Sequence, residues 1–298
     1  MNLKTPLVSI CLPLYNGEKF LQEALDSVKN QTYENIELIV SDDNSIDNSL
    51  KIINDFKRHV NFPVFVYHHQ PFGIGANWNN CVMNSNGDYI KFLFQDDVIT
   101  SNCIEEMMNY AKLNDKIGIV YSKRHFLYDN NNLKVVEWIK TYGNLHLSWK
   151  ENKIKDGIIN KGVDLLKDKD LFSSPLNKIG EPTAVLLKKE VFGKIGFFSQ
   201  ELKQTLDVDF WLKVMKYYDV ILIDKKLVSF RLHDQQTTSI NKDNNLDESL
   251  LFFKSMYENL FWNLSFKNRC KLFLDYHIIG RFFKKFIKLK KILLFQKR

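Results

Sequence analysis

The stretch Val8-Ser-Ile-Cys-Leu-Pro-Leu-Tyr-Asn-Gly17 decides the fold. Its first half is an apolar run rich in β-branched residues that ends at Pro13, which predicts a buried strand. Asn16-Gly17 predicts a turn, and the apolar residues that follow it recur at helical spacing. A second apolar run, Ile36 to Val40, is followed by the polar loop Ser41 to Ser45. This order of strand, helix and strand indicates the start of an α/β fold.

The alternation of strands and helices continues along the chain. Further strands are predicted at 64–67, 90–94, 117–121 and 220–223. Such alternation predicts the α/β class with a doubly wound, mostly parallel sheet. Residues 123–180 are less regular and are expected to form an inserted acceptor-side region, whereas the pattern from about Asn245 onward is helical. We therefore expect a catalytic domain over residues 1–240 and a helical extension over residues 241–298.

The bulk composition indicates a packed protein in a reducing compartment. Apolar residues make up 45% of the 298 residues, which is enough for a core. The four cysteines are scattered and lack the close spacing of a disulfide framework or a zinc site. The sequence shows neither a signal-peptide pattern nor a charge-free run of the ~18–20 apolar residues that cross a bilayer. We therefore expect a cytoplasmic protein.

The net charge of +7 is concentrated at the C-terminal end. Residues 267–298 carry +10, which leaves −3 for residues 1–266. An apolar helical stripe in this tail comprises Leu272, Tyr276, Ile279, Phe283, Phe286 and Leu293. A basic stripe beside it comprises Arg281, Lys284, Lys288 and Lys291. A basic amphipathic helix with aromatic residues favours an anionic membrane surface, here the inner face of the cytoplasmic membrane.

Two alternatives remain for this tail. It could pack on the catalytic domain and present a solvated basic face. It could also bind nucleic acid, but no nucleic-acid-binding module is recognisable and the rest of the chain is acidic. We therefore expect no nucleic-acid partner.

Polar residues directly follow three of the predicted strands. These clusters are Tyr15-Asn16, Asp42-Asp43 and Asp96-Asp97. Ligands bind at the carboxyl ends of strands in doubly wound sheets, so we expect the clusters to share a site. Together with Asp207-Val-Asp-Phe-Trp-Leu212, the order and spacing of these motifs resemble the inverting family 2 glycosyltransferases. Those enzymes have the A-type nucleotide-sugar-binding fold, and the resemblance covers roughly residues 6–235.

The resemblance implies that the first loops hold a nucleotide. Asp42 would contact uracil or ribose, with Pro13 and Tyr15 shaping the base pocket. The other nucleotide-binding candidates are Asn16, Asn77, Gln95 and Asp96. The alternative for Asp42 is that its loop only caps the next helix. Trp78 stands where related enzymes often have Arg, and we expect it to pack in the core rather than to stack on the ligand.

Asp96-Asp97 resembles the end of the family's acidic metal motif. This implies Mn²⁺ or Mg²⁺, which would stabilise the charge that develops on a departing diphosphate. The usual first Asp of the motif falls on Phe94, so the expected metal contact depends on Asp96, and Gln95 would partly replace the missing contact. Arg231 and His233 match a late motif whose residues approach the diphosphate or the metal. The alternative for Asp96-Asp97 is an ordinary turn at a strand end.

Sugar transfer with inversion needs a base that takes the proton of the acceptor hydroxyl. By resemblance, Asp207 aligns with the Asp of the family's Glu-Asp pair, whereas Leu206 occupies the Glu position. Asp207 is the candidate base and Asp209 the reserve. The alternative is that Asp207 caps the helix that begins there. The remaining candidates for the donor or acceptor pocket are Asp97, Glu181, Asp209, Trp211 and Arg231.

The resemblance implies transfer of a hexose or N-acetylhexosamine from a UDP-sugar to a saccharide or lipid-linked saccharide acceptor. The product would belong to a capsule, O-antigen or other exopolysaccharide. A sugar-nucleotide pyrophosphorylase is a rival, but it would need a Gly-rich basic loop that residues 13–17 lack. A catalytically silent nucleotide-sugar-binding or membrane-associated module is another rival, because Phe94 and Leu206 replace acidic residues.

Overall fold

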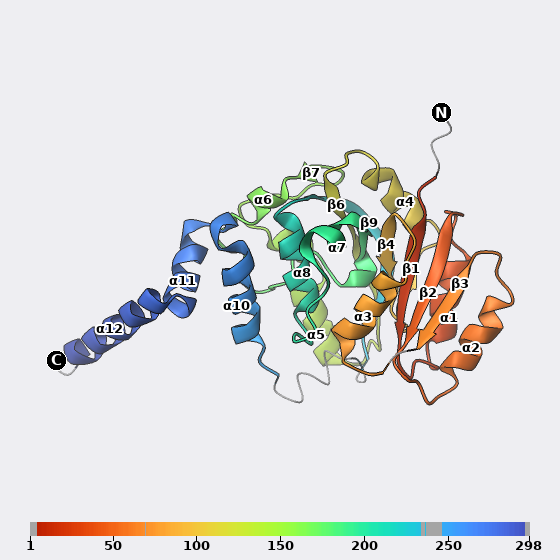
Figure 1. Cartoon of the computed structure of the whole chain (residues 1–298), viewed down its shortest axis with the longest axis horizontal. Coiled ribbons are helices and arrows are strands. Elements are labelled where there is room, and N and C mark those ends of the chain that lie inside the picture. The colour runs from red at the N-terminus through yellow and green to blue at the C-terminus, as the bar shows by residue number, and fades with distance from the viewer. Residues whose placement is uncertain (1–4, 69, 234–235, 237–245, 296–298) are drawn as a thin grey trace.

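A nine-stranded mixed sheet forms the centre of the protein (Figure 1). The computed structural model describes residues 5–68, 70–233, 236 and 246–295, with side chains up to Phe286 in the last helix. The strands are β1 (Val8–Leu14), β2 (Ile36–Asp42), β3 (Val64–His68), β4 (Tyr89–Phe92), β5 (Val98–Ile99), β6 (Ile117–Leu127), β7 (Ile159–Asn160), β8 (Val185–Lys188) and β9 (Asp219–Arg231). Their order is β3-β2-β1-β4-β8-β6-β9-β5, with β7 also paired to β9.

Most of these strands run in one direction. β1 is parallel to β2 and β4, and β3 is parallel to β2. β8 is antiparallel to both β4 and β6, so β6 has the direction of β4, and β9 is parallel to β6. Only the short strands β5, β7 and β8 run the other way. The predicted α/β fold with a mostly parallel sheet is therefore confirmed.

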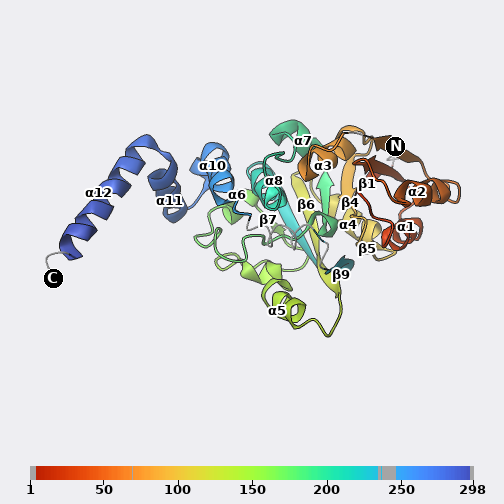
Figure 2. The ribbon, with the colours of Figure 1, turned by 90° about the horizontal axis from the view of Figure 1, so that it is seen from below.

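Helices cover both faces of the sheet, as expected for a doubly wound fold (Figures 1 and 2). The helices on one face are α1 (Leu21–Lys29), α2 (Ser49–Lys57) and α4 (Cys103–Ala111). Those on the other face are α3 (Ile74–Met83), α7 (Glu190–Ile195), α8 (Leu206–Met215) and α10 (Ser249–Leu260). β1 serves both cores, since Ile10 and Leu12 pack into the first and Cys11 into the second. Successive side chains of a strand point to opposite faces, so one buried strand needs cover on both.

The region 123–180 has more regular structure than the sequence pattern indicated. β6 continues through its first part to Leu127, and it is followed by α5 (Leu133–Tyr142), the 3₁₀ turn Leu145–Ser148, β7 and α6 (Gly162–Leu165). Asn132 caps α5 by accepting a hydrogen bond from the backbone N–H of Val135. None of the side chains of α5 is fully buried, although the ring of Trp138 packs against Phe126 and Phe230.

Over residues 246–295 the structure describes three helices and a short turn. They are α10, the 3₁₀ turn Phe261–Asn263, α11 (Phe266–Tyr276) and α12 (Ile278–Phe295). α10 packs against α8 through Phe252, Met256 and Leu260, whereas α12 projects away from the rest of the protein in both views (Figures 1 and 2). The division of the chain at residue 240 stays a prediction.

The prediction of one continuous apolar stripe in this tail is wrong. α11 ends at Tyr276 because His277 has an extended backbone, with φ −77° and ψ 138°. Leu272 on α11 is fully buried in the core, whereas Ile279 and Phe283 on α12 are exposed. The predicted positions Lys288, Lys291 and Leu293 lie outside the side chains that the structure describes.

Within the described ranges, no helix is both long enough and apolar enough to cross a membrane.

Candidate active site

A cavity of about 570 Å³ opens at the carboxyl ends of β1 and β4. Loops after these strands line it, together with the start of α8 and the residues after β9. The structure brings nine of the predicted site residues to this cavity: Pro13, Tyr15, Asn16, Asn77, Gln95, Asp96, Glu181, Asp207 and His233. Five predicted residues do not line it: Asp42, Asp97, Asp209, Trp211 and Arg231.

The loop after β1 is held in place by hydrogen bonds to its backbone. Asn16 has a left-handed backbone with φ 48°, and its side-chain oxygen accepts from the N–H of Ile46 at 2.9 Å. The side chain of Gln95 accepts from the N–H of Tyr15 at 2.9 Å and donates to the Tyr15 carbonyl at 3.0 Å. Gln95 therefore braces the loop that carries Tyr15, a role that its place in the sequence did not indicate.

Asp42 lies behind the cavity rather than on its wall. Its side chain is 1% exposed, accepts from the N–H of Ser45 and lies 3.2 Å from Nδ1 of His68. The next residue, Asp43, lines the cavity instead. Successive residues at a strand end point to opposite sides, and sequence spacing alone does not show which of two adjacent carboxylates faces the ligand. Asp42 does not cap α2 either, because Asn48 occupies the N-terminal cap position and Asp42 bonds within its own loop.

Asp96 forms a pair with His233 at the opening of the site. Oδ2 of Asp96 and Nε2 of His233 are 2.9 Å apart, and both side chains are about one-fifth exposed. The ring of Phe20 lies against His233, with 5.4 Å between ring centroids. The two residues are 137 positions apart in the chain, so the fold itself creates the pair.

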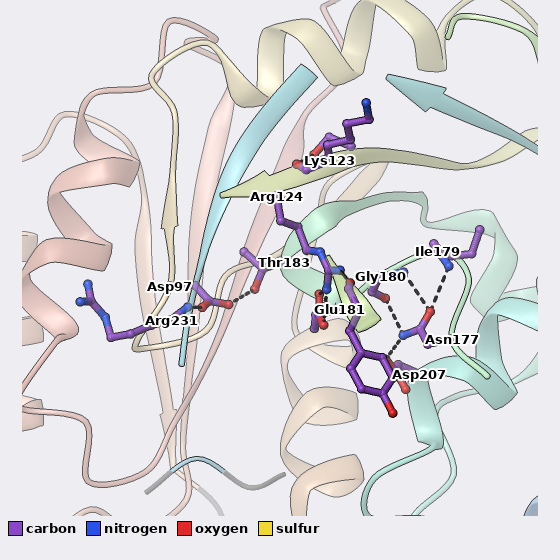
Figure 3. Close-up of polar contacts among 12 residues, drawn as sticks. Asp97, Lys123, Arg124, Asn177, Ile179, Gly180, Glu181, Thr183, Asp207 and Arg231 are labelled. Atoms are coloured by element: carbon purple, nitrogen blue, oxygen red, sulfur yellow. Dashed lines mark hydrogen bonds and ion pairs between the residues drawn. The ribbon is translucent and has the colours of Figure 1, made fainter. Parts of the chain in front are cut away.

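Asp97 and Arg231 support Asp96 from behind. Asp97 is buried; it accepts from the N–H of Arg231 at 3.0 Å and from the hydroxyl of Thr183 at 2.6 Å (Figure 3). Burial, and then the charge of Asp96, raise the pKa of the Asp97 carboxyl well above its ordinary value. The guanidinium of Arg231 donates to the Asp96 carbonyl at 2.8 Å and lies over the ring of Phe20. Asp97 and Arg231 therefore do not contact the cavity as expected. They form hydrogen bonds that connect neighbouring segments of the chain.

Asp207 is the second residue of α8 and lies on the cavity wall. Its carboxylate accepts from the N–H of Val208 at 2.8 Å and from the side-chain amide of Asn177 at 3.0 Å. Burial raises the pKa of Asp207 to about 7, and the negative charge of Glu181 adds to this effect. The N-terminal cap position of α8 is occupied by Thr205. A carboxyl group that titrates near neutral pH at the edge of a cavity is suited to proton transfer.

Asn177 connects Asp207 to the loop that carries Glu181. Its side-chain oxygen accepts from the N–H groups of Ile179 and Gly180, and its amide donates to the Gly180 carbonyl as well as to Asp207 (Figure 3). Gly180 has φ +137°, a conformation that residues with a Cβ rarely adopt. The conformation of this loop and the position of Asp207 are therefore fixed together.

Glu181 is held by a buried arginine that sequence reasoning missed. Arg124 is 4% exposed and forms an ion pair with Glu181; it also donates to the Tyr142 carbonyl (Figure 3). Arg124 lies in the region that had no clear pattern, 57 positions from Glu181. No signal in the single sequence links Asn177 or Arg124 to the site.

Asp209 and Trp211 support α8 from its buried side. Asp209 is 1% exposed and accepts from the Ser255 hydroxyl at 2.5 Å and from the Lys213 ammonium at 2.7 Å. Trp211 donates its indole N–H to the Gly180 carbonyl at 3.1 Å. The prediction that Asp209 and Trp211 line the pocket is wrong, because both side chains lie on the buried side of α8. Trp78, by contrast, packs in the core as expected, against Phe92, Phe94 and Phe198.

The sequence carries the signature of a known enzyme family. The family model described as Glycosyl transferase family 2 matches residues 9–166, which is more than half of the chain. The chain belongs to glycosyl transferase family 2. A relative from Rickettsia typhi, described as an uncharacterized glycosyltransferase, is 31% identical over 240 residues that cover 80% of this chain and 68% of the relative.

Solved structures share the fold of this glycosyltransferase. S. aureus TarS 1–349 in complex with UDP-GlcNAc matches with a TM-score of 0.60 and 18% identity, over 85% of this chain and 65% of that one. The mannosyltransferase PcManGT from Pyrobaculum calidifontis, in complex with GDP-Man and Mn²⁺, matches with a TM-score of 0.56 and 13% identity, over 88% and 64% of the two chains. The glycosyltransferase thus has the A-type fold, and it spans about two thirds of each of these relatives.

The cavity of the glycosyltransferase is rich in carboxylates. Its charged lining comprises Asp43, Asp96, Glu181 and Asp207 against Lys19 and Lys203. Glu181 is already paired with the Arg124 guanidinium, and burial raises the pKa of Asp207 to about 7, so the net negative charge of this lining is small. A divalent cation would offset the charge that a diphosphate ligand itself brings.

Asp96 and His233 fit a metal ion that is held jointly by the protein and by the phosphates of the bound substrate. Among the described residues, no group of three or more His, Cys, Asp or Glu side chains forms a complete metal cage. The adjacent oxygen of Asp96 and nitrogen of His233 form a two-ligand set. Mg²⁺ and similar cations are commonly bound by one or two carboxylates together with phosphates of the substrate. The pair therefore suits a cation that arrives with a nucleotide diphosphate.

Proposed function

We propose that this glycosyltransferase moves a hexose or N-acetylhexosamine from a UDP-sugar to a saccharide acceptor with inversion at the anomeric carbon. The observation that carries the proposal is the position of Asp207, a buried carboxyl group with a pKa of about 7 on the wall of the same cavity as Asp96 and His233. The UDP-GlcNAc bound to TarS supports a UDP-sugar as the donor class.

Asp207 acts as the general base in the proposed reaction. The ionised carboxylate takes the proton of an acceptor hydroxyl as that oxygen attacks the anomeric carbon, and the bond to the diphosphate breaks on the opposite face of the sugar. A base whose pKa lies near the working pH is ionised in a substantial fraction of the molecules and is still basic enough to accept the proton. The amide of Asn177 keeps one oxygen of Asp207 oriented, at 3.0 Å.

The nucleotide occupies the side of the cavity that the loops after β1 and β2 form. Tyr15 is 56% exposed, and it provides an aromatic face for a base. Asn16, Asp43 and Asn77 provide polar groups around it. In this proposal Asp43 takes the direct nucleotide contact, since Asp42 is buried behind it.

Asp96 and His233 would hold Mn²⁺ or Mg²⁺. When bound, the cation neutralises charge on the departing diphosphate. The partial exposure of both side chains and their 2.9 Å separation support this assignment. The Mn²⁺ in the complex of PcManGT is a further argument for a divalent cation.

The C-terminal helix α12 suits a role on the inner face of an anionic membrane. Phe282, Phe283 and Phe286 are each more than half exposed, and Arg281 and Lys285 are exposed between them. Large aromatic side chains beside basic ones bind the interface of anionic bilayers. A peripheral position there would bring the enzyme to lipid-linked saccharide acceptors, such as precursors of a capsule, O-antigen or exopolysaccharide.

A catalytically silent nucleotide-sugar-binding module is the second candidate. Phe94 and Leu206 line the cavity at positions where the family commonly has acidic residues, which favours this alternative. A panel of nucleotide-sugars with Mn²⁺, scored for nucleotide release and for transfer to saccharide acceptors, tests both candidates. Turnover with a UDP-sugar supports the enzyme. UDP binding without turnover of any donor would establish the silent module instead.

A further inference from the structure

One carboxylate joins the beginnings of α8 and α10. Glu248 precedes α10 and is only 7% exposed. Its carboxylate accepts hydrogen bonds from the backbone N–H groups of Lys203, Gln204 and Thr205, the last two at 3.1 Å. It also accepts from the Thr205 hydroxyl at 3.0 Å. Four donors thus converge on a single side chain from another helix.

The segment that Glu248 holds leads into the candidate active site. Lys203 and Gln204 line the cavity, and so do Leu206 and Asp207 directly after them. Thr205 is the N-terminal cap residue of α8, and its side chain makes no capping hydrogen bond within the helix. N–H groups at a helix start lack acceptors within the helix. Glu248 supplies acceptors to the N–H group of this cap residue and to those of the two residues before it, which lead into α8.

The helix that follows Glu248, α10, is itself fixed against α8. Its residue Ser255 donates to the buried carboxylate of Asp209 on α8 at 2.5 Å. Phe252 and Met256 of α10 pack in the same core as the buried side of α8. Glu248 directly precedes α10, and α10 is itself packed against α8. The hydrogen bonds to Glu248 therefore restrain the backbone of residues 203–207.

We propose that Glu248 is a positioning residue for sugar transfer, which holds the 203–207 segment so that Asp207 stays in place on the cavity wall. The inference rests on the proposed function of Asp207 as the base. Hydrogen bonds to an ionised acceptor are about twice as strong as neutral ones, so this contact is a strong restraint. A displacement of about 1 Å of a catalytic group can lower a rate by about 10²-fold.

The position of Glu248 separates its effect on the reaction from any effect on nucleotide binding. On the proposed nucleotide side of the cavity, the backbone N–H groups of Tyr15 and Asn16 donate to Gln95 and Ser45, which lie outside the segment that Glu248 holds. Loss of Glu248 should therefore lower kcat much more than it weakens binding of UDP. The charge of Glu248 also contributes, after burial and Glu181, to the raised pKa of Asp207. Removal of this charge should lower that pKa.

The test compares Glu248→Gln and Glu248→Ala with the matched control Asp247→Asn. Asp247 is an exposed carboxylate one residue away that accepts from the N–H of Ser249, the first residue of α10. We expect kcat to fall by about 10²-fold in Glu248→Ala, with a smaller loss in Glu248→Gln because the amide oxygen still accepts hydrogen bonds. Binding of UDP, measured by calorimetry, should change little. The control should retain wild-type kinetics.

Two readouts remain informative if an activity assay fails. Amide hydrogen exchange of residues 203–205 should accelerate in both Glu248 variants and not in the control. The carboxyl pKa of Asp207, followed by NMR, should fall in Glu248→Gln. Wild-type exchange and pKa in a folded Glu248→Gln protein would overturn the positioning role, as would equal kinetic losses in the control. Absence of transfer by the wild-type protein with every donor would instead refute the proposed function and leave these two readouts to decide on Glu248.

Discussion

The buried carboxyl group of Asp207 leads to opposite predictions for activity and stability. Asp207→Asn removes the proposed base while keeping the shape of the side chain. Transfer should therefore be abolished, whereas the affinity for UDP should stay nearly unchanged. Because burial raises the pKa of Asp207 from 3.8 to about 7, the ionised form that catalysis needs is the form that the fold disfavours.

The size of the stability effect follows from the two pKa values. The contribution of Asp207 to stability is fully present below pH 4, where the group is neutral in both states, and it is lost as the pH rises through 7. A pKa of about 7 instead of 3.8 corresponds to a cost of about 4 kcal/mol at pH 8. The variant keeps only one of the two acceptor oxygens, so either the N–H of Val208 or the side-chain amide of Asn177 loses its acceptor, which costs about 1–2 kcal/mol. Asp207→Asn should thus be more stable than the wild type by about 2 kcal/mol at pH 8.

Denaturant unfolding at pH 8 and pH 5 measures this difference. The advantage of Asp207→Asn should shrink by about 2–3 kcal/mol at pH 5, because most of the wild-type carboxyl is then protonated in the folded state. In parallel, kcat/KM of the wild type should rise about 50-fold between pH 5 and pH 7, since the ionised fraction grows from about 1% to about half. A variant that is less stable than the wild type at both pH values, together with a flat pH–rate profile, would refute the assignment.

Three further predictions concern other parts of the molecule. Asn177→Ala should lower kcat by about tenfold, as expected for a lost orienting hydrogen bond of about 1.4 kcal/mol; unchanged steady-state kinetics would contradict this role. Asp96→Asn and His233→Ala should each weaken Mn²⁺ binding in the presence of UDP, measured by calorimetry, and metal affinity equal to that of the wild type would exclude the pair. Combined Arg281→Gln and Lys285→Gln should weaken binding to phosphatidylglycerol vesicles by about 30-fold, at ~1 kcal/mol for each charge, without affecting transfer to a water-soluble acceptor. Vesicle binding that persists, or a helix α12 that is covered in a dimer detected by light scattering, would contradict membrane docking.

Local sequence patterns predicted the parallel part of the sheet and the loops that form the cavity. Apolar runs such as Val8 to Leu12 identify buried strands without any knowledge of their neighbours, because a strand covered on both faces has to be apolar throughout. Tyr15 and Asn16 after β1, and Gln95 and Asp96 after β4, lie at the cavity as predicted, because the carboxyl ends of parallel strands meet at one edge of the sheet.

The predictions failed where two neighbouring carboxylates were both candidates and only one of them lines the cavity. Asp42 and Asp43, Asp96 and Asp97, and Asp207 and Asp209 are each pairs in which one carboxylate lines the cavity and the other is buried beside it. Which member faces the ligand depends on strand twist, helix start and loop path, and none of these is encoded in spacing alone.

The amino-acid sequence by itself determined the fold class, the edge of the sheet where the cavity opens and the family, because these follow from periodicity and from motifs within short segments. Only the tertiary structure decided the partners of each carboxylate: His233 beside Asp96, Asn177 and Glu181 beside Asp207, and Glu248 at the start of α8. Those partners are 26–137 residues away in the chain, so their effects on charge, pKa and position arise only when the packed core brings distant segments together.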